Sequence, residues 1–336
     1  MKRRQQSYLI ILCLVFGFFF VHPAAYGAVT LKLGSFQSPS SALGQGLTLF
    51  GKLVEEKTKG EVKLNIGFSS SFGGWTVLLQ SIETGAVDMM VEDIGGWEFL
   101  DPALRIVRFP YVFRDYNHYV KYLNSPIFEE SRRKLDARNH HIFLPSKEMV
   151  WERGPYRVLV SKKPVFSAAD VTGLRLRLYE SETAKKVWGQ GLGANTTVIA
   201  WAETYLALRQ GMVDSVTTPI DLLYDMKFTE ACKYVTNINE FLQNNTIAIG
   251  SRRWKSFSPS IQKAMNEAAI EMARKMNTLL YEQVEKDIQR MMDDHGASFI
   301  RVSLKSFQEK VKPLVDELES QNFWPKGLYN KIQEIK

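Results

Sequence analysis

The sequence contains very little cysteine, and this scarcity limits the kinds of protein it can encode. Only two cysteines occur among 336 residues. Cys13 lies in an apolar N-terminal stretch that we expect to be removed, which leaves Cys232 as the single thiol of the mature chain. A disulfide scaffold is therefore excluded, and the fold must be stabilised by its hydrophobic core. Cys232 has no histidine near it in the sequence, which favours an inert thiol over a nucleophile.

Motifs for catalysis, phosphate binding and metal binding are also missing. Residues 46–52 resemble a phosphate-binding loop, but Leu53 stands where that loop needs Ser or Thr, and the segment has an amphipathic helix pattern. The histidines lack metal-ligand spacing, since His140 and His141 are adjacent and their rings diverge. No G-x-S-x-G nucleophile turn is present. We therefore predict that the protein is not an enzyme and that it holds no metal and no cofactor.

Long apolar runs are absent except near the N-terminus. Basic residues at 2–4 precede an apolar stretch at 7–21, and Ala25 and Gly27 supply the small residues of a cleavage site. This pattern predicts a secretory signal peptide over residues 1–27 and a periplasmic location, with an uncleaved membrane anchor as the alternative. Cleavage removes three basic residues and no acidic ones, so the net charge falls from +7 to +4. A mildly basic mature chain favours an anionic small ligand and no nucleic acid.

The mature chain alternates strand patterns with helix patterns. Strand patterns at 30–34, 61–68 and 87–91 are separated by helix patterns at 40–58 and 77–84. This β-α-β-α-β order predicts an α/β lobe with a mostly parallel sheet.

A second lobe is indicated by an internal echo. Residues 79–88 and 206–214 share a helix pattern, then Gly85 or Gly211, then an apolar pair and an aspartate before a strand. The glycine suits the left-handed cap that ends a helix. The echo favours two similar lobes that face each other across a cleft, and a shared helix-to-strand turn is the simpler alternative. We expect the second lobe to begin near Pro155.

The longest predicted helix runs from Pro259 to His295. Ser258 is its expected cap, Pro259 occupies the first helical position and Gly296 ends it. At 1.5 Å per residue the helix spans roughly 55 Å, which is longer than one lobe. It should therefore lie across both lobes.

Two arginines are candidates for binding an acid. Arg157 begins an apolar strand pattern, and Arg177 alternates with leucines at 174–178. If the leucines point to one face, Arg177 points to the other. A buried arginine needs an anion because its desolvation is costly, and its planar fork matches a carboxylate. A solvated sheet edge is the alternative for both residues.

Several segments in series resemble one known family. They are Gly173-Leu174-Arg175-Leu176-Arg177, Trp201-Ala202-Glu203-Thr204-Tyr205, residues 206–214, Phe72-Gly73-Gly74, residues 85–88 and Phe109-Pro110-Tyr111-Val112-Phe113. In this order they resemble the substrate-binding subunit of tripartite ATP-independent periplasmic (TRAP) transporters, the DctP-type solute-binding proteins. The resemblance covers nearly the whole mature chain.

The resemblance implies a two-lobed α/β periplasmic binding protein, with a long helix spanning both lobes and a cleft that closes on its ligand. We place lobe I at 28–154 plus about 243–283, and lobe II at about 155–242 plus 284–336 with the C-terminal helices. The expected partners are an organic acid and the small and large membrane subunits of a transporter, and the receptor is expected to be a monomer. A periplasmic enzyme and a ligand-presenting sensor are the competing functions.

The resemblance also implies a set of ligand-binding residues. Arg177 falls on the family's signature arginine for the ligand carboxylate, with Arg157 assisting and Trp201 packing on the ligand. The remaining candidates face the cleft from either lobe: Phe36, Gln37, Trp75, Asp93, Trp97, Glu180, Thr217 and Thr218. The family often has Glu-Asn where this chain has Thr217-Thr218, which removes an amide from the carboxylate site.

Ligand identity is left open by these residues. Three tryptophans, Trp75, Trp97 and Trp201, favour a bulky or aromatic monocarboxylate, because tryptophan offers a large apolar face. One or more of them could instead be core residues. A sugar acid or a small dicarboxylate is the alternative ligand, with Gln37, Asp93 and Glu180 as partners for hydroxyl groups.

Overall fold

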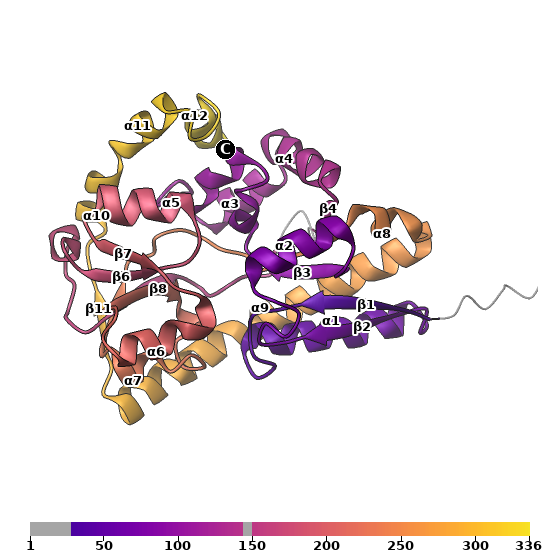
Figure 1. Ribbon diagram of the computed structural model, residues 1–336, viewed down its shortest axis with the longest axis horizontal. Coiled ribbons are helices and arrows are strands. Elements are labelled where there is room, and N and C mark those ends of the chain that lie inside the picture. Colours follow the sequence, from indigo (N-terminus) through magenta and orange to yellow (C-terminus); the bar gives the residue numbers. More distant parts are fainter. Residues whose placement is uncertain (1–27, 144–149) are drawn as a thin grey trace, which may run out of the picture.

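The chain forms two α/β lobes, each built on its own sheet (Figure 1). The structure is a computed structural model that describes residues 28–143 and 150–336. The predicted signal peptide at 1–27 lies outside the described residues. Within the described ranges, no helix is both long and apolar enough to span a membrane.

The first lobe contains a five-stranded sheet. Its strand order is β2 (Val62–Gly67), β1 (Val29–Gly34), β3 (Met89–Glu92), β10 (Thr246–Gly250) and β4 (His140–Phe143). β1 pairs in parallel with both β2 and β3, whereas β10 is antiparallel to its neighbours. β10 runs the other way because it enters this sheet from the second lobe. The predicted mostly parallel arrangement therefore holds for the first three strands.

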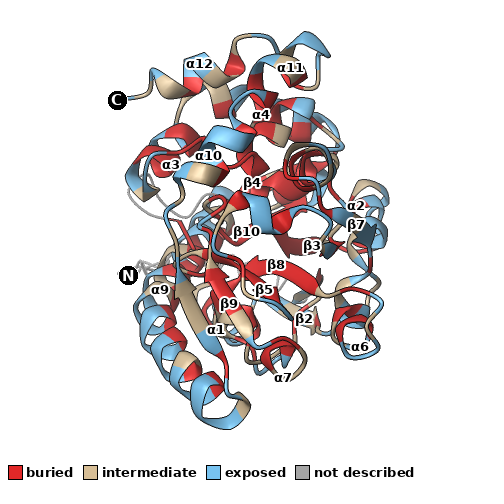
Figure 2. Ribbon diagram, turned by 90° about the vertical axis from the view of Figure 1, so that its left-hand side faces the viewer, coloured by how far each residue is buried: buried red, intermediate tan, exposed pale blue. Residues whose placement is uncertain are grey.

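The second lobe contains a six-stranded sheet. Its strand order is β11 (Ser298–Arg301), β9 (Tyr234–Asn237), β5 (Arg157–Ser161), β8 (Ser215–Pro219), β6 (Arg175–Leu178) and β7 (Asn195–Val198). β5 is antiparallel to β8 and β9, and the other pairs are parallel. Each sheet thus contains one strand of opposite direction, and in each case that strand adjoins a segment crossing between the lobes. Figure 2 shows that β5 and β8, in the middle of this sheet, are largely buried.

Helices cover both sheets. In chain order they are α1 (Ala42–Lys57), α2 (Trp75–Thr84), α3 (Tyr116–Leu123), α4 (Pro126–Ala137), α5 (Glu182–Ala184), α6 (Thr204–Arg209), α7 (Phe228–Ala231), α8 (Ser251–Ser256), α9 (Pro259–His295), α10 (Lys305–Val311), α11 (Leu314–Ser320) and α12 (Leu328–Gln333).

The predicted helix from Pro259 to His295 is confirmed as α9. The Ser258 hydroxyl accepts the backbone N–H of Ile261, and Gly296 ends the helix with a φ of 62°, a conformation that costs glycine little. The first half of α9 packs in the core of lobe I, and its second half packs in the core of lobe II. Because one continuous helix belongs to both cores, it ties the lobes together along one side (Figure 1).

The internal echo corresponds to real structural equivalence. α2 and the turn after α6 both reach a glycine with positive φ, Gly85 at 85° and Gly211 at 73°. The aspartates that follow each accept a hydrogen bond from an arginine. Asp88 accepts from Arg253 Nε at 3.2 Å, and Asp214 accepts from Arg175 Nε at 2.7 Å. The same turn therefore joins a helix to a strand in both lobes.

The C-terminal helices bridge the lobes, whereas the sequence placed them with the second lobe alone. α10 and α11 pack on lobe II, where the Ala168 N–H donates to the Ser306 hydroxyl at 3.2 Å and the Gln190 side chain donates to Glu317 at 2.6 Å. α12, however, docks on lobe I. There the His118 ring nitrogen Nε2 lies 2.9 Å from the Ile332 carbonyl, and the Gln333 side chain donates to the Val112 carbonyl at 2.6 Å. Phe109 packs edge-on against Trp324, with ring centroids 5.4 Å apart. These long-range contacts have no signature in the local sequence.

Two extended segments cross between the lobes beside each other. Glu152 pairs with Asn244 as an isolated antiparallel bridge, and the Arg153 N–H donates to the Gln243 carbonyl at 3.2 Å. Gly154 follows with a φ of 69°, which favours glycine. The paired crossing segments and α9 connect the two lobes.

Candidate ligand-binding cleft

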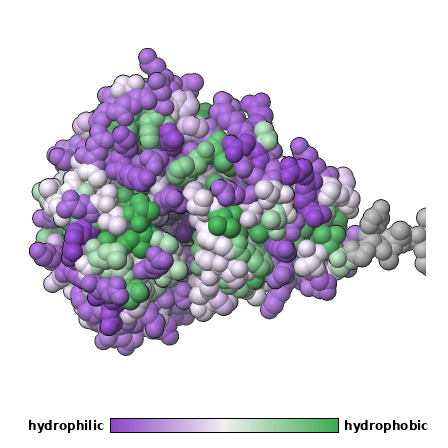
Figure 3. Space-filling view, viewed as in Figure 1, coloured by the Kyte–Doolittle hydropathy of each residue, from purple (hydrophilic) through white to green (hydrophobic). Residues whose placement is uncertain are grey.

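A cavity of about 550 Å³ lies between the two lobes. Its lobe II wall comes from the ends of β6, β7 and β8, and its lobe I wall comes from residues after β1 and β3 and at the start of α2. Ligands of open α/β sheets bind beyond the carboxyl ends of parallel strands, and both sheets present those ends here. Figure 3 shows hydrophobic side chains on either side of the hollow. Val77 and Val198 belong to the cavity lining and are about half exposed.

Arg177 lies on the lobe II wall and is only 3% exposed. Its Nε and Nη2 groups both donate to the Ile199 carbonyl, at 2.9 and 2.7 Å, and its guanidinium lies 5.3 Å from the Trp201 ring. Among the described residues no carboxylate forms an ion pair with it. Burial, with a smaller effect from the nearby positive charge of Arg157, lowers its pKa to about 9. Arg177 is therefore a buried cation without a neutralising anion in the described part of the chain, which is a costly arrangement.

Arg157 lies on the same wall but already has a carboxylate partner. Its Nε donates to Glu240 at 3.2 Å, its Nη1 to the Gln243 side chain at 2.5 Å and its Nη2 to the Thr217 hydroxyl at 3.0 Å. The guanidinium lies 4.5 Å from the Phe241 ring. The charge of Arg157 is therefore balanced by Glu240 without a ligand, whereas Arg177 has no carboxylate partner among the described residues.

The lobe I wall carries a buried network of ion pairs. Arg108 contacts Asp93 through Nη2 at 2.6 Å and Nε at 3.1 Å, and Arg153 contacts Glu92. Burial alone would raise the pKa of Asp93, but Arg108 and Arg153 outweigh it and hold the pKa well below its usual range. Asp93 also accepts the Gly95 N–H at 2.9 Å. Asp93 lines the cleft as predicted, yet it is committed to partners within the protein.

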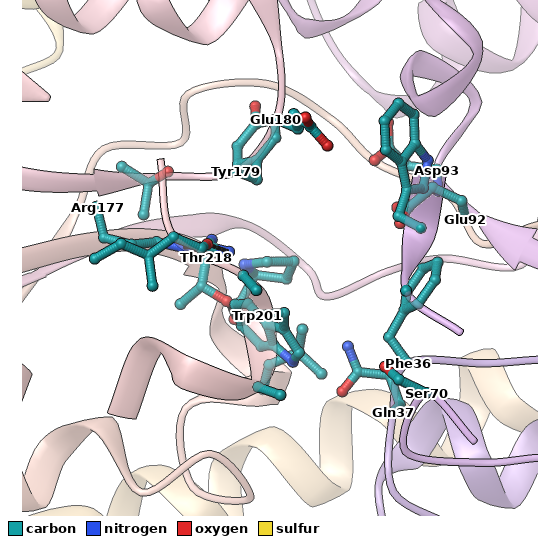
Figure 4. Close-up of a pocket in the computed structure, with 18 of the residues that line it drawn as sticks. Phe36, Gln37, Ser70, Glu92, Asp93, Arg177, Tyr179, Glu180, Trp201 and Thr218 are labelled. Atoms are coloured by element: carbon teal, nitrogen blue, oxygen red, sulfur yellow. Dashed lines mark hydrogen bonds between the residues drawn. The ribbon is translucent and has the colours of Figure 1, made fainter. Parts of the chain in front are cut away.

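Most of the predicted site residues meet in this one cavity. Figure 4 shows Phe36 and Gln37 facing Trp201 and Thr218 from the opposite lobe. The lining includes these members of the predicted set: Phe36, Gln37, Trp75, Asp93, Arg157, Arg177, Glu180, Trp201, Thr217 and Thr218. Glu180 accepts a hydrogen bond from the Thr76 hydroxyl across the cleft at 3.0 Å, so it contacts the other lobe as well as the cavity.

Trp97 is the exception, and its assignment to the cleft was wrong. It is 0% exposed, packs in the hydrophobic core and does not line the cavity. Its indole N–H donates to His140 Nδ1 at 3.1 Å. The short helical turn at Ile94–Trp97, begun by Asp93 as its cap, directs the ring into the hydrophobic core.

The position of Trp97 makes His140 a pH-dependent part of the core. Burial lowers the pKa of His140 to about 4, against about 6.5 for an exposed histidine. As the pH falls below about 6.5, the unfolded chain gains a proton that the folded chain does not, so the folded state loses stability. We expect His140 to contribute about 2 kcal/mol of destabilisation between pH 7 and pH 4.5.

Urea unfolding at both pH values measures this contribution. His140→Gln keeps a hydrogen-bond acceptor for Trp97 but does not titrate, so its stability should fall less than that of the unaltered protein. Because other titrating groups are common to both proteins, they cancel in the comparison. Equal losses in the two proteins would show that His140 is protonated without cost.

Sequence reasoning missed several residues that line the cleft. The missed residues include Ser70, Glu92, Arg108, Arg153, Tyr179 and Gln243. Arg108 ends a short 3-10 helix at Pro102–Arg108, and Arg153 lies in a segment that crosses between the lobes, so neither belongs to a strand or α-helix pattern. Tyr179 follows Arg177 by two residues, so the same alternation that indicated Arg177 could have indicated it.

Comparison with known proteins identifies the family. The model for bacterial extracellular solute-binding protein family 7 (DctP) matches residues 33–322. The chain belongs to this family. The 2,3-diketo-L-gulonate-binding periplasmic protein YiaO of Escherichia coli is 25% identical over 92% of each chain, and the C4-dicarboxylate-binding periplasmic protein DctP of Rhodobacter capsulatus is 23% identical over 88% of each.

A solved TRAP periplasmic solute-binding protein from Polaromonas, bound to D-erythronate, has the same fold. It is 25% identical, with a TM-score of 0.81 over 91% of this chain and 99% of the other. The predictions of a two-lobed TRAP solute receptor, and of a binding protein rather than an enzyme, are therefore confirmed. The named relatives are periplasmic, in agreement with the predicted location.

Proposed function

We propose that this family 7 receptor binds a hydroxylated organic acid in the interlobe cleft, with the ligand carboxylate on Arg177. The observation that carries the proposal is the buried Arg177 guanidinium, which has no carboxylate partner among the described residues. A carboxylate would supply the missing charge and could accept two parallel N–H bonds from the guanidinium. Thr218, on the neighbouring strand, lines the same end of the cleft.

Unpaired polar atoms on the cleft walls are evidence that the ligand carries hydroxyl groups. Gln37 is 3% exposed, and its Oε1 has no hydrogen-bond partner in the described structure. The Tyr179 hydroxyl and the Trp201 indole N–H are buried and unpaired in the same way. Buried polar groups are costly when unsatisfied, so a ligand with several hydroxyls would stabilise this wall. The sugar-acid ligands named for YiaO and the Polaromonas protein have this chemistry.

A bulky or aromatic acid is the second candidate. Trp75 and Trp201 both line the cleft, and Val77 and Val198 flank it. The loss of Trp97 to the core removes one of the three tryptophans on which this ligand class was predicted. The sugar acid is therefore the better-supported ligand.

The ligand class can be tested directly. Small molecules released from gently purified protein are identified by mass spectrometry, and aldonates, uronates, aryl-acetates and aryl-pyruvates are compared by thermal shift. We expect aldonates or uronates to raise the melting temperature. A response to the aryl acids alone would establish the second candidate instead.

We also propose that the receptor delivers its ligand to the small and large membrane subunits of a TRAP transporter. Family membership supports this role. Uptake of the identified acid should be lost when either membrane subunit is deleted. Unchanged uptake, together with a changed transcriptional response to the acid, would indicate a sensor.

Ligand binding should close the cleft. The lobes already touch across the opening: the Ser38 hydroxyl donates to Asp225 at 3.0 Å, and the Thr76 hydroxyl donates to Glu180 at 3.0 Å. A ligand that contacts both walls favours the conformation in which these contacts form. Small-angle scattering should therefore give a smaller radius of gyration with ligand. An unchanged radius in a sample with confirmed binding would contradict closure.

A further inference from the structure

Four arginines line the cleft, and the structure neutralises three of them. Arg108 is paired with Asp93, Arg153 with Glu92, and Arg157 with Glu240. Arg177 forms no ion pair among the described residues. The described lining of the cleft therefore has one unpaired cation available for a ligand. If none of the four arginines were paired, the cleft could bind two or more anionic groups.

Glu240 determines how many unpaired cations lie at the Arg177 end of the cleft. Its Oε2 accepts Arg157 Nε at 3.2 Å, and its Oε1 accepts the Trp188 indole N–H at 2.6 Å. Both oxygens act as acceptors, which is the arrangement of an ionised carboxylate. Burial raises the pKa of Glu240, while Arg157 and the Trp188 bond favour the charged form. Without this charge, Arg157 would be a second free cation beside Arg177.

The opposite wall offers no site for another anion. Figure 4 shows Arg177 on one side of the cavity and Glu92 with Asp93 on the other. Both carboxylates are at most 9% exposed, and Glu180, which is exposed, adds a third carboxylate to the lining. A ligand held by one carboxylate on Arg177 and extending across the cleft would bring a second carboxylate towards these residues. Because Arg108 and Arg153 are already paired with Asp93 and Glu92, this second carboxylate would find no free cation there, and it would lie near Glu180, which forms no ion pair among the described residues. A desolvated carboxylate without a cation is strongly disfavoured.

We infer that this cleft selects monocarboxylates over dicarboxylates, and that Glu240 is a specificity-determining residue because it neutralises Arg157. The inference rests on the proposed function, since it assumes an acid bound through Arg177. It separates this chain from relatives such as the C4-dicarboxylate-binding protein of Rhodobacter capsulatus. Glu240 acts through Arg157 and does not line the cavity itself.

Matched pairs of acids test the inference. Calorimetry on ligand-free mature protein compares D-gluconate with D-glucarate, D-erythronate with meso-tartrate, and 4-hydroxybutanoate with succinate. The members of each pair differ chiefly by one terminal carboxylate. In every pair that binds, we expect the diacid to bind at least thirtyfold more weakly. Glu240→Gln removes the charge and keeps one acceptor oxygen, which can accept from Arg157 or from Trp188 but not from both. It should narrow this ratio at least tenfold by strengthening diacid binding.

Asp214→Asn is the matched control. It makes the same change in net charge by freeing Arg175, which is exposed and outside the cleft, and it should leave every ratio unchanged. A diacid that binds the unaltered protein as tightly as its monoacid would overturn the inference and leave the proposed function standing. A folded Glu240→Gln protein with unchanged ratios would overturn the role of Glu240.

Binding of none of the six acids would count against the proposed function and this inference together. Circular dichroism confirms that each variant is folded. If Glu240→Gln does not fold, the monoacid-to-diacid affinity ratios of the unaltered protein still test whether the cleft prefers monocarboxylates. Tighter binding of Glu240→Gln to both members of a pair alike would mean that Arg157 strengthens the first carboxylate site only, and would also contradict the inference.

Discussion

Arg177→Ala should weaken ligand binding by ~3–5 kcal/mol, or roughly 10²–10⁴-fold in the dissociation constant. The guanidinium is buried, has no ion-pair partner among the described residues and is held by the Ile199 carbonyl, so its orientation is fixed before the ligand arrives. Its loss would leave the ligand carboxylate desolvated and unpaired. Arg177→Lys should also bind poorly, because a lysine ammonium cannot donate two parallel bonds to one carboxylate.

Arg175 provides a control on the same strand. It is separated from Arg177 by one residue, but it is exposed and pairs with Asp214 at 2.7 Å. Arg175→Ala removes the same charge from the same sheet, and it should change affinity less than twofold. Calorimetry on the three variants with the acid that binds best gives the comparison. A loss below tenfold for Arg177→Ala would show that the carboxylate lies elsewhere.

Features set by short-range sequence signals could be predicted well. α9 was located to the residue because Ser258, Pro259 and Gly296 specify its ends within a few positions of the chain. Arg177 was found because a strand alternates its side chains, and an arginine between buried leucines must point away from them. The echoed turns at Gly85 and Gly211 were equally local.

Features set by long-range packing could not be predicted in this way. Nothing near Arg157 in the sequence reveals that Glu240, 83 residues away, cancels its charge. The bridging position of α12 depends on His118 and Val112 from the first lobe, more than 200 residues away. Two arginines with similar sequence surroundings thus have different roles, and only the tertiary structure separates the paired Arg157 from the unpaired Arg177.

Trp97→Ala should lower the free energy of unfolding by ~3–5 kcal/mol and leave ligand affinity almost unchanged. The side chain is fully buried in the lobe I core, and its truncation would leave a cavity and remove the hydrogen bond to His140. Trp75→Ala should have the opposite profile. Trp75 is only half-buried, lines the cleft and packs on the exposed Phe99 at a centroid distance of 5.4 Å, so its loss should weaken binding about five- to tenfold.

Urea unfolding and calorimetry on both variants separate stability from binding. If Trp97→Ala does not fold, Trp97→Phe retains most of the volume, and it should lose stability chiefly through the unpaired His140 nitrogen. The two tryptophans lie only 22 positions apart in the chain, so their contrast is not explained by distance from the cleft along the sequence. It follows from the turn at Ile94–Trp97, which directs one indole into the hydrophobic core, while the first turn of α2 places the other at the cleft. A large loss of affinity in a stable Trp97 variant would show that this turn rearranges when the ligand binds.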